Sequence, residues 1–374
     1  MSPPESGAAA TSAAGGRLTI DLQALTDNWR TVGRQVAPAT LGAVVKADAY
    51  GIGIEPAVRA LSAAGCKTFF VALADEGLRA RRVAPDAAIY VLNGLIGGTA
   101  PLLIAADLRP VLNSLLEVRD WLTARRPHAS GAALHIDTGM NRLGISLEEA
   151  KALAARRDLV ANLGLTLLMS HLACADTPSH PRNAVQLARF REAVAAFPGI
   201  PTSFANSAGA FLSAEYHGDL VRPGVALFGG RWSNGSSPLR PVVTAEARLL
   251  AVREVPAGEP LGYGAAETAK RRSRVGILAA GYADGFHRLA GGTDDRPGAR
   301  LFLHGSFANL IGRVSMDLMA VDVTDLPQAK PGDLVELFGP NIPVDEMAAA
   351  AGTIGYEILT GFGRRFDRLY AGTE

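Results

Sequence analysis

Eight short apolar runs between residues 40 and 230 constrain the fold of this chain more than any other feature. Each run is rich in Val, Ile, Leu and Phe, lacks strict alternation, and is separated from the next by a stretch that contains a helical pattern. Strands buried on both faces of a parallel sheet have this composition. The runs are LGAVVK (41–46), TFFVA (68–72), AIYVL (88–92), LRPVLN (108–113), AALHID (132–137), LGLTLLMS (163–170), TSFAN (202–206) and GVALFG (224–229).

Eight consecutive strand–helix units predict an α/β fold with a (β/α)8 barrel. A doubly wound open sheet is the alternative that this pattern leaves open. Ser114 and Ser146 stand where helices are expected to begin, and both are good N-cap residues. Glu149 follows Ser146 at the spacing of a capping box, which strengthens the second helix start.

The pattern changes after RWSNGSSPLRP (231–241), where strand-like segments are joined by Gly and Pro turns and one short helix is expected near VDEMAAAAG. We therefore expect the barrel over residues 17–240 and a mostly β domain over residues 241–374. Segment 16–25 has a strand pattern and is a candidate to pair with the C-terminal sheet. Residues 1–16 are small, polar and rich in Gly and Pro, which predicts a disordered leader.

Composition narrows the class of protein. A formal net charge of +1 gives no reason to expect a nucleic-acid or membrane partner. The two cysteines, Cys66 and Cys174, cannot form a disulfide framework, which suits a reducing compartment. The first residues lack the features of a signal peptide, and no apolar stretch reaches the roughly 18 residues of a membrane span. The expected location is the cytoplasm.

Working residues in such a barrel lie where the strands end and in the loops that follow. Lys46 ends the first run, and Arg142 and His171 follow the fifth and sixth. Asn206 and Ser207 stand at the end of the seventh run, and Arg222 leads into the eighth. Each of these residues alone is more often solvated or structural. Together they would place a lysine, two arginines, a histidine and a serine around one barrel mouth.

This set of side chains favours two chemistries. A lysine nucleophile is useful when a carbonyl condenses with it as a Schiff base. A serine at a helix start, with a glycine-rich loop after the last strand, is typical of a phosphate site. Lysine and phosphate site together indicate pyridoxal phosphate or an aldolase for sugar phosphates. The sequence has no G-x-G-x-x-G run, no P-loop and no histidine pair at ligand spacing, which disfavours dinucleotides, ATP and a metal hydrolase.

Nine motifs that run in order from Lys46 to Arg365 resemble the alanine racemase family of pyridoxal-phosphate enzymes. The motifs are AVVKADAYGIG, HIDTGMNRLG, MSHLACAD, FANSAG, VRPGVALFG, LGYGAAET, AAGYADGF, GRVSMD and GTIGYEILTGFGRR. The resemblance covers the whole expected fold and implies interconversion of L- and D-alanine. It also implies a homodimer in which Tyr263 of one subunit reaches the site of the other.

The resemblance implies a role for each matching residue. Lys46 would bind pyridoxal 5'-phosphate covalently and act as one catalytic base, and Tyr263 would be the other. The residues implied in cofactor binding are Lys46, Tyr50, Arg142, His171, Asn206, Ser207, Arg222, Gly224, Val225 and Tyr356. Arg142, Met316 and Tyr282 would contact the substrate. Asp176, Arg288 and Arg313 would line the access corridor, together with Tyr282.

Three positions depart from the family pattern. His135 stands where many members have a carboxylated lysine bound to the arginine of this motif, so a carbamate cannot form there. Another anion or a water would then orient Arg142. Asn141 replaces a commoner glycine, and Ser315 stands where many members have cysteine. Neither of the two implied bases is affected.

Other functions remain open at this point. One is a racemase of broader specificity, and another is a decarboxylase of the related barrel family. A decarboxylase usually needs a cysteine from the β domain, and both cysteines here lie in the barrel half. A non-enzymatic alternative is a pyridoxal-phosphate-binding homeostasis protein, which would have the barrel alone. A racemase could supply D-alanine for peptidoglycan or serve alanine catabolism.

Overall fold

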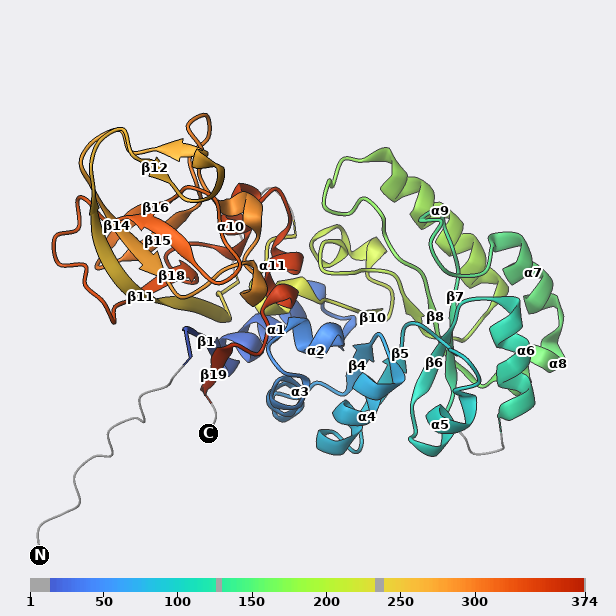
Figure 1. The fold of residues 1–374 in the computed structure, drawn as a ribbon. Helices are drawn as coiled ribbons and strands as arrows, with labels where there is room; N and C mark the ends of the chain where they lie inside the picture. Colours follow the sequence, from blue (N-terminus) through green and yellow to red (C-terminus); the bar gives the residue numbers. More distant parts are fainter. Residues whose placement is uncertain (1–13, 126–129, 233–238, 373–374) are drawn as a thin grey trace, which may run out of the picture. The chain divides into compact units, whose positions relative to one another are not determined.

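The computed structural model describes residues 14–125, 130–232 and 239–372, so most of the predicted leader lies outside the described residues. The chain forms two compact units. The barrel unit comprises Asp21–Val242, and the β unit comprises Val243–Tyr370 together with the segment that ends at Ile20 (Figure 1). Gly16 opens strand β1 (Gly16–Asp21), so it belongs to the folded chain and not to a leader. In the described part of the chain, no helix has the length and apolar character needed to cross a bilayer.

The barrel unit contains a closed ring of parallel strands. One sheet runs in the order β3-β4-β5-β6-β7-β8-β9, and β10 pairs in parallel with β2. Asp219 N–H donates to Thr202 O (2.9 Å) and so links β10 to β9, which closes the ring. The bounds are β2 Thr40–Leu41, β3 Ala43–Val44, β4 Thr68–Val71, β5 Ala88–Val91, β6 Arg109–Leu112, β7 Ala132–His135, β8 Leu165–Met169, β9 Thr202–Ser203 and β10 Leu220–Val221. With β2 and β3 counted as one interrupted strand, the prediction of a (β/α)8 barrel is confirmed.

The prediction of the eighth strand is wrong. The run 224–229 contains a 3₁₀ helix, η3 (Val225–Phe228), and the eighth strand is β10, which precedes it. A short buried apolar run does not distinguish a strand from a buried helical turn, and here the strand ends at Val221, before the run begins at Gly224. Arg222 therefore follows the eighth strand and lies at the C-terminal end of the barrel strands, as the other candidates do.

Helices follow most of the strands, and side-chain caps mark the starts of several of them. Ser114 accepts from Glu117 N–H (3.2 Å) and Ser146 from Glu149 N–H (3.1 Å), so both predicted N-caps are confirmed. The helices of the barrel unit are α1 Leu22–Val36, α2 Lys46–Tyr50, α3 Ile54–Ala63, α4 Ala74–Val83, α5 Ala100–Ala105, α6 Leu115–Ala124, α7 Leu147–Ala155, α8 Arg157–Leu163 and α9 Pro181–Ala196.

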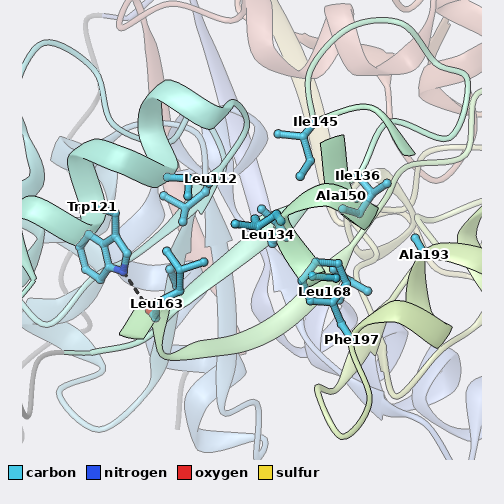
Figure 2. Close-up of a cluster of buried hydrophobic side chains, with 14 of the residues drawn as sticks. Leu112, Trp121, Leu134, Ile136, Ile145, Ala150, Leu163, Leu168, Ala193 and Phe197 are labelled. Carbon is cyan, nitrogen blue, oxygen red and sulfur yellow. Dashed lines mark hydrogen bonds between the residues drawn. The ribbon is translucent and has the colours of Figure 1, made fainter. Parts of the chain in front are cut away.

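An apolar cluster joins strands β6 to β8 to the helices that cover them. Leu134 and Leu168 lie in it, from β7 and β8. Figure 2 shows the indole N–H of Trp121, from α6, directed at the carbonyl oxygen of Leu163 at 3.1 Å. This bond satisfies the one polar atom of a fully buried side chain, so the cluster contains a large aromatic group without an unpaired donor.

The β unit is a second closed sheet. Its strands run β14-β17-β16-β15-β18-β11, and β11 also pairs with β14, so that six strands form a barrel. β1 lies between β11 and β19, with Gly16–Ile20 antiparallel to Val243–Ala247. The bounds are β11 Val243–Val255, β12 Pro260–Leu261, β13 Glu267–Thr268, β14 Ser273–Leu278, β15 Arg300–Leu303, β16 Ser306–Ile311, β17 Met319–Asp322, β18 Leu334–Phe338 and β19 Phe366–Ala371, with helices α10 Val344–Ala350 and α11 Gly355–Gly361.

Candidate active site

Lys46 lies at the start of a left-handed helical turn. It follows β3 by two residues and so does not end the strand, contrary to the prediction. The next four residues, Ala47 to Tyr50, have φ between 53° and 55°. A left-handed conformation costs about 1–2 kcal/mol for each residue other than glycine. Four such residues in a row, beside a lysine, mark a backbone that the surrounding structure must hold in place.

Burial and one cationic neighbour act on the amine of Lys46. Burial lowers the pKa of Lys46, and the positive charge of Arg142 lowers it further. The carboxylate of Glu76 acts in the opposite direction and is the smaller effect. Both burial and the arginine therefore favour the neutral amine, which is the form that reacts with a carbonyl.

Arg222 is buried beneath the barrel mouth and bonded to two strand ends. Its guanidinium donates to Ser170 O (2.6 Å) and to Ser203 Oγ. Burial lowers the pKa of Arg222 to about 9, which leaves it protonated at neutral pH. The guanidinium also lies 3.5 Å from Nδ1 of His171 and can only donate there.

His171 is held neutral. Burial, Arg222 and Arg142, in that order, hold its pKa well below the ordinary range. The amide nitrogen of Asn206 lies 3.4 Å from Nε2 and donates to Leu172 O (3.3 Å), while Asn206 Oδ1 accepts from Gly209 N–H (2.9 Å). Both ring nitrogens of His171 therefore face donors, and the neutral ring can accept from only one of them.

His135 lies on β7 and its side chain is buried. Burial lowers its pKa to about 4, with Arg222 and Arg142 acting in the same direction. Nδ1 lies 2.8 Å from Oδ1 of Asn113, whose amide donates to the carbonyls of Leu92 and Val111. The Asn113 amide is thereby oriented with its oxygen toward the ring, so Nδ1 carries the proton of neutral His135.

A carboxylate organises the loop that carries Arg142. Oδ1 of Asp137 accepts from the N–H groups of Gly139 (2.9 Å), Met140 (2.9 Å) and Asn141 (3.1 Å). Asn141 has φ 57°, a value that asparagine tolerates better than most residues, which accounts for its presence where glycine is commoner. The exposed Arg142 follows directly, and its charge acts on Lys46, His135 and His171.

An anion cradle lies at the start of η3. Ser207 Oγ accepts from Gly224 N–H (2.8 Å) and Ala226 N–H (3.4 Å), which leaves its own O–H to donate. A Cβ at Gly224 would lie 2.1 Å from the hydroxyl oxygen of Tyr50, so only glycine admits this approach. The ring of Tyr50 stacks on Phe228 at 4.6 Å, in the same helix as Val225. Hydroxyl donors at a helix start suit a phosphate group.

Four of the predicted residues of the β unit lie on loops that approach each other two by two. Tyr263, in η4 (Tyr263–Ala265), is 70% exposed, and a Cβ on the adjacent Gly264 would lie 2.7 Å from the guanidinium of Arg313. Tyr282 N–H donates to Ser315 O (3.0 Å), and Ala283 N–H donates to Met316 O (3.0 Å), so the loops carrying Tyr282 and Met316 are bonded together. The remaining predicted residues are Arg288 in η6 (Arg288–Ala290), Tyr356 in α11 and, in the barrel unit, the exposed Asp176.

Sequence reasoning missed several residues of the site. Glu76 accepts from the N–H groups of the left-handed turn, and Ser170 and Ser203 hold Arg222. Glutamate in the first turn of a helix and serine at a strand end are common everywhere, so their types carry no signal. The described residues contain no group of three or more His, Cys, Asp or Glu side chains arranged to hold a metal ion.

Comparison with known proteins assigns the family. Residues 20–231 match the family described as "Alanine racemase, N-terminal domain", and residues 242–370 match "Alanine racemase, C-terminal domain". The chain is 50% identical to an alanine racemase of Rhizobium meliloti (strain 1021), over 96% of this chain and 97% of that protein. It is 47% identical to a biosynthetic alanine racemase of Agrobacterium fabrum, over 95% and 93%.

A solved structure agrees with these sequence matches. The alanine racemase of Bartonella henselae with covalently bound pyridoxal phosphate is 37% identical, with a TM-score of 0.89, and the match covers 96% of this chain and 100% of that one. Both family domains, the sequence relatives and this fold lead to one assignment. The chain belongs to the alanine racemase family.

Proposed function

We propose that this protein is a pyridoxal-phosphate-dependent racemase that interconverts L- and D-alanine. The observation that carries the proposal is a lysine whose pKa is lowered, with arginines and an anion cradle on the same end of one barrel. A racemase works in both directions, so the same site serves D-alanine supply and alanine consumption. Both domains match alanine racemase family models, which supports racemisation of alanine over a decarboxylation.

The residues present fit the cofactor. The hydroxyls of Ser207 and Tyr50, beside Gly224 and Val225, would hold the phosphate, and Lys46 would hold the aldehyde carbon. Arg222 would donate to the ring nitrogen without giving up its proton. Pyridoxal phosphate, when bound, supplies an electron sink that acidifies the α-proton of an attached amino acid.

Two bases on opposite faces of the substrate perform a racemisation with little movement. We assign these roles to the amine of Lys46 and the phenol of Tyr263. Burial and Arg142 favour the neutral amine of Lys46, which can then accept a proton. His171, kept neutral by burial, Arg222 and Arg142, has one ring nitrogen that can donate and one that can accept.

Tyr263 is proposed to act in the site of a partner subunit. Its 70% exposure leaves the phenol available to a second chain. Exposed apolar side chains follow four successive barrel strands, β4 to β7: Leu73, Ile96 and Leu143 in loops, and Leu116 in the first turn of α6. Such an apolar rim is expected where a surface is covered in an assembly.

Proton exchange tests the activity. The purified protein is loaded with pyridoxal phosphate and incubated separately with L- and D-alanine in D2O. We expect loss of optical activity together with deuterium at the α-carbon for both enantiomers. Absence of exchange in cofactor-loaded protein would refute the proposal. A panel of larger amino acids in the same assay distinguishes alanine racemase from a racemase of broader specificity.

Mixed dimers test the placement of Tyr263. Lys46→Ala and Tyr263→Phe are each expected to suppress racemisation as homodimers. When the two are mixed and allowed to exchange subunits, each mixed dimer contains one intact site if Tyr263 acts across the interface, so about a quarter of wild-type activity returns. If Tyr263 acts within its own chain, no intact site forms and activity stays absent.

A further inference from the structure

The left-handed turn that begins after Lys46 is held by a carboxylate from the next βα unit. We infer that Glu76 is a positioning residue for Lys46: its side chain fixes the backbone of the turn and thereby sets the place of the lysine amine. The inference rests on the proposed role of Lys46 as the cofactor-bearing base. Glu76 acts through the turn, and no contact with substrate or cofactor is assigned to it.

Both carboxylate oxygens of Glu76 are used. Oε1 accepts from Ala47 N–H (2.6 Å) and, at 3.4 Å, from Asp48 N–H. Oε2 accepts from Ala72 N–H (2.8 Å) and Leu73 N–H (3.2 Å), at the end of β4 and the start of α4. One side chain therefore ties the Lys46 turn to the neighbouring strand and helix.

The same helix holds the turn a second time. Arg79, one helical turn after Glu76, pairs with Asp48 Oδ1 at 2.8 Å. The fork of Arg79 also binds both oxygens of Glu55, in α3, at 2.7 and 2.5 Å. Asp48 Oδ1 further accepts from Ile54 N–H (3.0 Å), which opens α3. Helix α4 thus contacts the turn through a carboxylate at its start and through an arginine farther along.

The geometry of the turn explains why an acceptor is needed. The first N–H groups of any helical turn have no acceptor within the turn, and a left-handed turn of non-glycine residues is strained as well. Glu76 supplies the acceptor to the first two N–H groups after Lys46. The negative charge of Glu76 also raises the pKa of Lys46, and so opposes the positive charge of Arg142, which lowers it.

The main test compares Glu76→Gln with Glu149→Gln, in the intact chain loaded with pyridoxal phosphate. Glu149 accepts from Ser146 N–H (2.8 Å) in the capping box of α7 and serves as the matched control. Glutamine keeps one carbonyl acceptor but presents an amide donor to N–H groups on the other side. For Glu76→Gln we expect kcat for alanine to fall about tenfold with KM nearly unchanged, and no effect in the control.

A second measurement does not depend on racemisation. Cofactor is removed from the full chain, and the rate at which Lys46 binds added pyridoxal phosphate is followed by visible absorbance. We expect about a tenfold slower rate in Glu76→Gln than in wild type or Glu149→Gln. Adding Ala47→Gly to Glu76→Gln should restore most of the rate, because glycine adopts positive φ without strain.

Rates of Glu76→Gln equal to those of the control, or no recovery with Ala47→Gly, would overturn the inference. Failure of wild type to racemise alanine while Lys46 still binds the cofactor would refute the proposed function and leave this test in force. If Glu76→Gln does not fold, Glu76→Asp replaces it, since it keeps the charge but is too short for both sets of N–H groups, and the same slowing is expected.

Discussion

Neutral side chains surrounded by positive charge characterise this site at the scale of single residues. Burial and Arg142 lower the pKa of Lys46, and burial together with Arg222 and Arg142 keeps His135 and His171 unprotonated. Arg222 keeps its charge because strand-end oxygens accept from it. An anionic cofactor would therefore find fixed positive charge near groups that remain free to accept or relay a proton.

The buried His135 should make folding sensitive to acid. In the unfolded chain histidine binds a proton below about pH 6.5, whereas folded His135 stays neutral down to about pH 4. The unfolded state therefore takes up more protons in this range, and stability falls as the pH drops through it. Between pH 7 and pH 5 this group accounts for a loss of about 2 kcal/mol.

Urea unfolding of wild type and His135→Asn at both pH values checks this expectation. The variant should lose about 2 kcal/mol less than wild type between pH 7 and pH 5. Asparagine is chosen because it can keep a hydrogen bond to Asn113. An identical acid dependence in the two proteins would show that His135 is not responsible.

Residue types set what could be predicted at this scale. Lys46, Arg142, His171 and Arg222 could be predicted only as a group, because each alone is more often solvated or structural whereas together they follow four separate barrel strands. The left-handed turn after Lys46 was not, because alanine and aspartate are also ordinary helix-start residues and φ leaves no mark in the sequence when glycine is absent. Glu76 could not be predicted either, because glutamate is common in the first turn of a helix.

Among the elements, the loop that carries Tyr282 depends on a glycine for its close approach to a neighbour. A Cβ at Gly281 would lie 2.3 Å from Met316 O and 2.4 Å from Ser315 O, both backbone atoms. Gly281→Ala must therefore separate the loops carrying Tyr282 and Met316. We expect about 1–3 kcal/mol of destabilisation and weaker substrate binding, seen as a higher KM.

Gly33→Ala provides the comparison for this variant. Gly33 lies inside α1, and a Cβ there would meet only Leu41 Cδ2 at an ordinary 3.7 Å. Alanine should stabilise the helix by up to about 1 kcal/mol and leave KM unchanged. Equal KM values in Gly281→Ala and wild type would mean that the loop pair does not contribute to substrate binding.

Helix α6 is anchored by Trp121, whose indole N–H reaches Leu163 O (Figure 2). Trp121→Ala should cost about 3–5 kcal/mol, because a large buried group leaves a cavity. Trp121→Phe should cost less, about 1–3 kcal/mol, since the ring is mostly retained but a buried carbonyl loses its donor. Urea unfolding measures both, and an equal cost for the two would contradict the assignment.

Element types were predictable where length and pattern agreed. The first seven parallel strands coincide with apolar runs, and the caps at Ser114 and Ser146 mark two helix starts. The eighth run became η3 because strand pairing ends at Pro223, whose carbonyl accepts from Val44 N–H (2.9 Å). That ending depends on a contact with a strand far back in the chain, which local pattern cannot reveal.

At the scale of the whole molecule, the two units are interleaved along the chain. The sequence predicted a barrel and a β domain, but the β unit also takes its strand β1 from before the barrel. Removing residues 1–20 should expose the facing edges of β11 and β19 and destabilise the β unit. Removing only residues 1–13, which precede β1, is the control.

Thermal unfolding and solubility of the two truncated chains distinguish the outcomes. We expect lower thermal stability and aggregation for the longer deletion alone, because unpaired strand edges associate. Wild-type behaviour of that chain would mean that the β unit closes without β1.

The position of β1 has a consequence for synthesis on the ribosome. β1 leaves the exit tunnel before the barrel unit, but its partner β11 is translated only after that unit, and its other partner β19 later still. The nascent chain therefore carries an unsatisfied strand throughout translation of Asp21–Val242. The barrel can fold as it emerges, whereas the β unit can be completed only once β19 has emerged and can pair with β1.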